Sequence, residues 1–193
     1  MKRIFIFTIG LALILGGGLV LSAKADSLQR PTMQPQSVGQ MRTEPNQAVK
    51  PISYQVAERP VGLYVPRLNL FLEVDEGHYN PVSKTWNLSS TRAQWATITP
   101  RANNTSGNTF VYAHNYPAVF GRLSELNAGD DFILLGEGGH RFVYTMTSRL
   151  ETNPYDDRLF YYTGPPILTV QTCSGLWDQN RLLITFKLTR VEK

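Results

Sequence analysis

The sequence predicts a mainly β domain over residues 56–193, arranged as a closed barrel or a sandwich. Short apolar runs rich in β-branched and aromatic residues recur along this part of the chain, and turn-forming residues separate them. Only one short segment has a helical pattern. A length of about 138 residues suits a single compact domain.

Seven runs are expected to form strands. In the last of them, Ile184, Phe186 and Leu188 alternate with polar neighbours, which is the period of a strand with one buried face. The seven runs cover residues 61–65, 69–74, 109–113, 131–135, 141–148, 167–172 and 182–190.

The connections have their own signals. Gly136-Glu137-Gly138-Gly139 lies between two of the runs and predicts a hairpin turn. One short helix is expected at 120–126, ahead of Asn127-Ala128-Gly129. Residues 151–166 contain three prolines and predict a long loop, and long loops on a rigid sheet often carry recognition.

Residues 1–25 have the features of an export segment. Lys2 and Arg3 precede the uncharged run 4–23, which is long enough to cross a bilayer and would leave the rest of the chain outside. Ala23-Lys24-Ala25 also resembles a signal-peptidase site. The length of the run favours a retained signal anchor, with residues 4–22 in the membrane. Cleavage after Ala25 would release the protein instead.

Residues 26–55 predict a flexible tether, because they are rich in Pro, Gln and Ser and poor in apolar side chains. The net charge of +4 is concentrated before the tether, since Lys2, Arg3 and Lys24 supply +3 of it without any acid in residues 1–25. The remaining chain is therefore near +1 and has no basic run that would indicate a nucleic-acid partner.

Cys173 is the only cysteine, so an internal disulfide is excluded. It follows the run Thr169-Val170-Gln171-Thr172 and precedes a Ser-Gly turn, which would place the thiol at a strand end. Arg181 begins the next strand, and a nearby cation favours the nucleophilic thiolate. The competing interpretation is a small buried side chain with no chemical role.

His114 ends another apolar run and precedes the turn Asn115-Tyr116-Pro117. At a strand end it could act as a general acid or base, whereas the alternative is a histidine in a surface turn. His78 and His140 lack this setting and are expected to be solvated. One cysteine and three scattered histidines give no pair of metal ligands at a usable spacing. The number of acidic residues near the cysteine strand, Glu151, Asp156 and Asp157, is too ordinary to predict a calcium site. No cofactor is expected.

These residues resemble a known family. Thr169-Val170-Gln171-Thr172-Cys173 is similar to the Thr-Leu-x-Thr-Cys motif of sortases, with Val170 in place of leucine. A strand ending in histidine, the segment 120–130 and a downstream arginine follow in the order that sortases use. The run 61–69 resembles their first strand, and Ala113 stands where the family usually has glycine.

The resemblance implies an eight-stranded β-barrel with one or two short helices and the activity of an extracytoplasmic cysteine transpeptidase. Cys173 would cleave a surface protein at a motif resembling Leu-Pro-x-Thr-Gly, His114 would transfer protons, and Arg181 would stabilise the oxyanion. Thr172 would help to line the substrate site. The acceptor would be an amine of a cell-wall peptide or a pilin lysine. No pilin-type lid motif precedes residue 60.

Three other functions compete with a sortase-like transpeptidase. A thiol peptidase would pass the acyl group to water instead of an amine. An L,D-transpeptidase would have a histidine just before the cysteine, where this chain has Gln171 and Thr172. A β-barrel binding module would keep the cysteine buried and inert.

Overall fold

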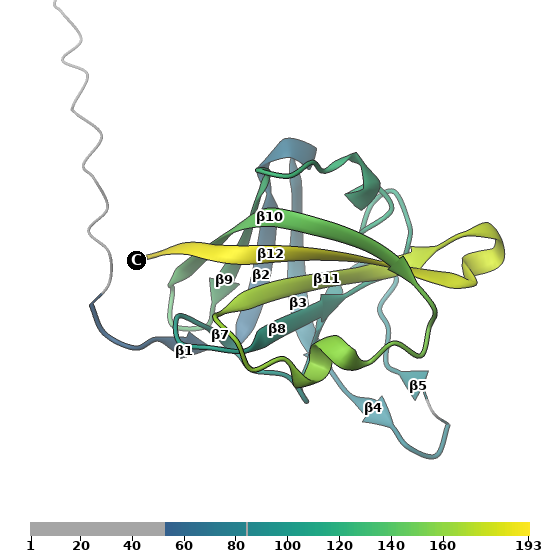
Figure 1. Cartoon of the computed structure of the whole chain (residues 1–193), viewed down its shortest axis with the longest axis horizontal. Coiled ribbons are helices and arrows are strands. Elements are labelled where there is room, and N and C mark those ends of the chain that lie inside the picture. The colour runs from purple at the N-terminus through teal and green to yellow at the C-terminus, as the bar shows by residue number, and fades with distance from the viewer. Residues whose placement is uncertain (1–52, 84) are drawn as a thin grey trace, which may run out of the picture. The chain divides into compact units, whose positions relative to one another are not determined.

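The computed structural model describes residues 53–83 and 85–193. They form a closed barrel of eight strands, whose neighbours follow the order β10-β12-β11-β8-β6-β3-β2-β9 (Figure 1). The mainly β class and the closed barrel are therefore confirmed, and the sandwich is not formed. The expected membrane segment and most of the expected tether fall on residues 1–52, outside the described residues. Among the helices that are described, none has the length and apolar character needed to cross a bilayer.

The elements are short apart from the last barrel strands. The barrel strands are β2 (Pro60–Val65), β3 (Leu70–Gly77), β6 (Ala93–Ala96), β8 (Asn108–Tyr112), β9 (Asp131–Gly136), β10 (Arg141–Thr152), β11 (Ile167–Ser174) and β12 (Asn180–Glu192). Outside the barrel, β1 (Ala57–Glu58) pairs with β7 (Ala102–Asn103), and β4 (Tyr79–Asn80) pairs with β5 (Thr85–Trp86). Four 3-10 turns complete the described residues: η1 (Pro66–Leu68), η2 (Leu123–Glu125), η3 (Arg158–Tyr161) and η4 (Leu176–Asp178).

The inner and outer faces of β11 and β12 pack against different groups of side chains. On β11 and β12, Leu168, Val170, Ile184 and Phe186 belong to the main core inside the barrel. The alternate residues face outward, as the two-residue period of a strand requires. A second group, here called the outer cluster, covers this outward face: Ala96, Phe110, Tyr112 and Leu183, with Trp86, Leu159 and Phe160 packed against them.

All seven expected strands are present, with shifted ends, but β6 is an eighth that the sequence did not reveal. Its four residues, Ala93–Ala96, are all buried, so the segment lacks the alternation that marks a half-buried strand. The expected helix at 120–126 is reduced to the three residues of η2. Strand β10 continues to Thr152, into the segment expected to be a loop.

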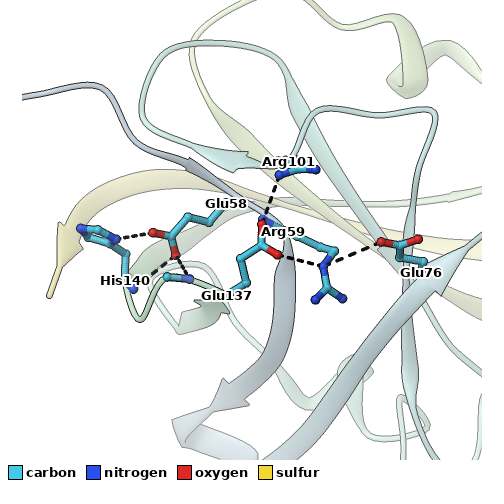
Figure 2. A network of polar contacts seen from close by, with 7 residues as sticks. Glu58, Arg59, Glu76, Arg101, Glu137 and His140 are labelled. Atoms are coloured by element: carbon cyan, nitrogen blue, oxygen red, sulfur yellow. Dashed lines mark hydrogen bonds and ion pairs between the residues drawn. The ribbon is translucent and has the colours of Figure 1, made fainter.

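The expectation that His140 is solvated is wrong. Its side chain is buried, and Nδ1 contacts the carboxylate of Glu58 (Figure 2). Nε2 lies 3.0 Å from the hydroxyl of Tyr54. The same carboxylate accepts a hydrogen bond from the backbone N–H of Gly138 at 2.9 Å. The β9–β10 turn thus holds the segment that leads into the barrel. His78, by contrast, is exposed as expected.

Candidate active site

Two neighbouring strands carry Cys173 and Arg181, and His114 lies two residues beyond the end of a third strand, β8. Cys173 of β11 is directly opposite Arg181 of β12 in the antiparallel register. On the other side, β11 runs parallel to β8 with Gln171 opposite Tyr112, and the N–H of Ala113 donates to the carbonyl of Gln171 at 3.2 Å. If this register is continued for two residues beyond the end of β8, it places His114 beside Cys173. Neighbouring strands lie about 4.8 Å apart, so the three residues form one row across the sheet.

The row lies on the outward face of the barrel. Tyr112 and Leu183, which belong to the outer cluster, are two residues away from His114 and Arg181 respectively and share their faces by alternation. Cys173 and His114 are both half-buried. A thiol in this position is shielded in part by protein and remains open to a substrate.

The protonation of the thiol is set by opposing effects. Burial raises the pKa of Cys173 above its usual range, the Arg181 guanidinium lowers it, and the Asp178 carboxylate raises it again. The net direction is upward, because desolvation disfavours the charged thiolate. At neutral pH the resting side chain is therefore a thiol, and its attack on a carbonyl requires a base.

Arg181 is oriented by the loop that precedes it. Its Nη1 donates to the carbonyl oxygens of Asp178 and Asn180, both at 2.9 Å. The loop itself is tightly turned, since Gly175, Trp177 and Asp178 all have left-handed backbone conformations. These contacts fix one end of the guanidinium, whose remaining N–H groups can donate to a substrate.

His114 lies at the start of a compact turn. Its carbonyl accepts from the N–H of Phe120 at 3.2 Å, and the carbonyl of Tyr116 accepts from Gly121 at 2.8 Å. A Cβ at Gly121 would come within 2.6 Å of the Tyr116 backbone, so this position needs glycine. The turn places the Tyr116 ring flat on the imidazole, with centroids 4.6 Å apart and an interplanar angle of 13°.

Thr172 lies away from this row. Its side chain is only 3% exposed, and its hydroxyl donates to the carbonyl of Ala113 at 3.0 Å. By alternation it occupies the opposite face of β11 from Cys173. The hydroxyl therefore links β11 to the residue before His114, and a part for Thr172 in lining the substrate site stays a prediction.

Comparison with known proteins identifies the family of this chain. The model of the sortase domain matches residues 63–189, which is more than half of the chain. The chain belongs to the sortase family. Its members are cysteine transpeptidases, and Cys173 is the one cysteine in this sortase.

Solved sortases share the fold at low identity. Sortase C-3 from Streptococcus pneumoniae is 20% identical, with a TM-score of 0.58 over 72% of this chain and 66% of that one, just under two thirds of its length. Sortase E1 from Streptomyces coelicolor, solved with a tripeptide in its active site, is 20% identical, with a TM-score of 0.55 over 69% of this chain and 90% of that one. Sortase C1 from Streptococcus agalactiae, in complex with MTSET, has a TM-score of 0.55 at 20% identity, over 68% of both chains. No curated protein matches the sequence.

Two further residues of this sortase touch the row or its loop, and the sequence did not single them out. Tyr116 stacks on His114, and its only sequence signal is its place in the turn two residues later. Glu151 of β10 bonds to Ser174 and Asn180, which flank the β11–β12 loop. Nothing in the sequence near Glu151 indicates this contact, because it depends on strands paired over a long separation. In residues 53–83 and 85–193 no cluster of His, Cys, Asp and Glu could hold a metal ion.

Proposed function

We propose that this sortase cleaves a surface protein at a motif resembling Leu-Pro-x-Thr-Gly and transfers it to an amine. The observation that carries the proposal is the row of Cys173 and Arg181 on paired strands with His114 just beyond the end of the adjoining strand, together with the family membership. A nucleophile, a proton carrier and a fixed cation in one row are the parts that acyl transfer through a thioester needs.

In the first half-reaction the sulfur of Cys173 attacks the threonine carbonyl of the motif. Because burial keeps the thiol protonated, His114 takes its proton as the carbon–sulfur bond forms. The guanidinium of Arg181 stabilises the oxyanion. When the C–N bond breaks, His114 gives the proton to the leaving glycine amine, and a thioester remains on Cys173.

In the second half-reaction an acceptor amine attacks the thioester. His114 accepts the proton of the amine and returns it to the departing sulfur, which restores the thiol. The acceptor is a cell-wall peptide or a pilin lysine, and the barrel acts outside the cytoplasm, held by residues 4–22. Thr172 supports the site by fixing the residue before His114 to β11.

The test is product analysis by mass spectrometry with a sorting peptide, in the presence and absence of an amine such as triglycine. The wild-type chain should form the amide with triglycine, and Cys173→Ala should form none. Formation of the hydrolysed peptide alone, at the same rate with and without the amine, would instead show a thiol peptidase.

The role of Arg181 has its own variant. Arg181→Lys keeps the charge but replaces a planar fork by a point charge, so most of the activity should be lost. Because each tenfold change in rate corresponds to about 1.4 kcal/mol, loss of an oxyanion donor worth about 3 kcal/mol lowers kcat by about a hundredfold. If Arg181→Lys retained the wild-type kcat, the guanidinium would have no part in the mechanism.

A further inference from the structure

Glu151 connects the two strands that carry the nucleophile and the arginine. Its Oε1 accepts hydrogen bonds from the Ser174 hydroxyl at 3.1 Å and from the side-chain amide of Asn180 at 2.9 Å. Ser174 and Asn180 form the last register pair of the β11–β12 hairpin, directly after the pair of Cys173 and Arg181. One carboxylate thus joins three strands at the point where the hairpin opens into its loop.

The carboxylate reaches this pair from the side away from the row. Glu151 is opposite Leu182 in the β10–β12 register, and Leu182 packs against the main core. Ser174 and Asn180 share that face, since each is one residue away from Cys173 or Arg181 on its strand. Glu151 therefore leaves the outward face, where a substrate would bind, unobstructed.

The loop beyond the pair gives little support of its own. Leu176 and Trp177 are 77% and 94% exposed, and the left-handed backbone of Trp177 and Asp178 costs free energy that packing does not offset there. The terminal pair of an antiparallel hairpin opens first when its loop is poorly packed. Opening at Ser174 and Asn180 would move Cys173 and Arg181 apart.

We propose that Glu151 is a positioning residue of the transfer reaction, which keeps the hairpin closed and so holds the sulfur and the guanidinium at their working separation. The inference rests on the proposed function, because it assigns Glu151 an effect on the same site. Glu151 exchanges no proton and contacts no substrate. Its effect passes through Ser174 and Asn180.

The experiment compares variants of the full chain by kcat and KM for a sorting peptide, by the alkylation rate of Cys173 with iodoacetamide, and by Tm. Glu151→Ala should lower kcat by about tenfold to a hundredfold, with KM changed less, because small displacements of reacting groups have effects of this size. Glu151→Gln keeps an acceptor oxygen and should restore kcat to within about threefold of wild type. Glu73→Ala is the matched control, since it removes an exposed carboxylate from a strand that does not adjoin β11 or β12.

The double variant Ser174→Ala/Asn180→Ala tests the route of the effect. It should lose as much kcat as Glu151→Ala, and adding Glu151→Ala to it should cause no further loss, because residues that act as a unit are not additive. Wild-type kcat in Glu151→Ala, or a further loss in the triple variant, would overturn the inference. If Glu151→Ala does not fold, unchanged kcat in the double variant overturns it. Absence of transfer by the wild-type chain would count against the proposed function instead.

Discussion

The imidazole of His114 has an aromatic ring on one of its faces. The half-exposed ring of Tyr116 stacks on it almost in parallel, and the backbone bonds of the turn hold both residues. A stacked ring limits rotation of the imidazole. The orientation of a predicted site residue thus depends on a single neighbour, as with Tyr116 beside His114 and the Asp178 carbonyl beside Arg181.

Tyr116→Leu should lower kcat by up to about tenfold, because an aromatic contact contributes about 0.5 to 1.5 kcal/mol. Tyr116→Phe keeps the ring and should retain wild-type kcat. Steady-state kinetics with a sorting peptide measure both, and Tyr155→Leu, at a 91% exposed tyrosine, is the control. Equal kcat in the Leu and Phe variants would show that the stacking has no role.

The charge of Arg181 should be visible in the thiol without any substrate. Arg181 lowers the pKa of Cys173 against the effect of burial, so Arg181→Gln should raise that pKa further above its usual range. The pH at which iodoacetamide alkylation reaches half of its maximal rate should move upward in the variant. An unchanged midpoint would mean that the guanidinium does not act on the sulfur.

At the scale of elements, the loop between β10 and β11 is fastened close to the row. Thr152 is opposite Arg181 in the β10–β12 register, and its hydroxyl donates to Asp156 at 2.9 Å. Arg158 also donates to Asp156, through Nε at 2.8 Å. The carboxylate therefore holds the first turn of a long loop against the strand end that adjoins Arg181.

These bonds predict an acid dependence of stability. The hydrogen bonds from Arg158 and Thr152 hold the pKa of Asp156 well below its usual range. Such a carboxylate stabilises the fold above its unfolded-state pKa of about 3.9, and this contribution is lost as the pH falls towards the lower folded pKa. In urea denaturation, the unfolding free energy of wild type should fall more steeply below about pH 4 than that of Asp156→Asn. Parallel curves would contradict the prediction.

The sequence predicted most elements because most follow local rules. Seven runs had the composition of strands, and Cys173, His114 and Arg181 could be selected because each lies at the end of such a run beside a turn. Strand β6 was missed because both of its faces are buried, so its residues do not alternate between apolar and polar. The face of Thr172 could have been deduced, since adjacent residues of a strand point in opposite directions.

Other features depend on contacts between distant residues and had no local signal. His140 was expected in solvent because it lies in a glycine-rich turn, but its partner Glu58, which is partly buried, comes from 82 positions earlier in the chain. Glu151 likewise meets Asn180 across 29 positions. Burial and pairing of this kind are set by the order of strands around the barrel, which composition and periodicity do not give.

For the whole molecule, the interior of the barrel carries the stability. Phe186 of β12 is fully buried and packs on Phe132 of β9 across the interior, with ring centroids 5.3 Å apart. These strands are not neighbours in the barrel order, so the contact connects separate parts of the wall.

Phe186→Ala should lower the unfolding free energy by about 3 to 5 kcal/mol, through lost burial and the cavity left behind. Urea denaturation followed by tryptophan fluorescence measures the change. Phe71→Ala, at a side chain 60% exposed, should change it by no more than about 0.5 kcal/mol. Similar losses in the two variants would mean that the interior packing does not dominate stability.

The hydrogen-bonded pairing of β11 with β12 sets the distance between Cys173 and Arg181. The carbonyl of Asp178 in the connecting loop orients the guanidinium, so both the pairing and this carbonyl must be kept. Deleting one residue inside β11 ahead of Cys173 would invert every following side chain, turning the sulfur inward and exposing Thr172. The strand that carries Cys173 must therefore keep its length.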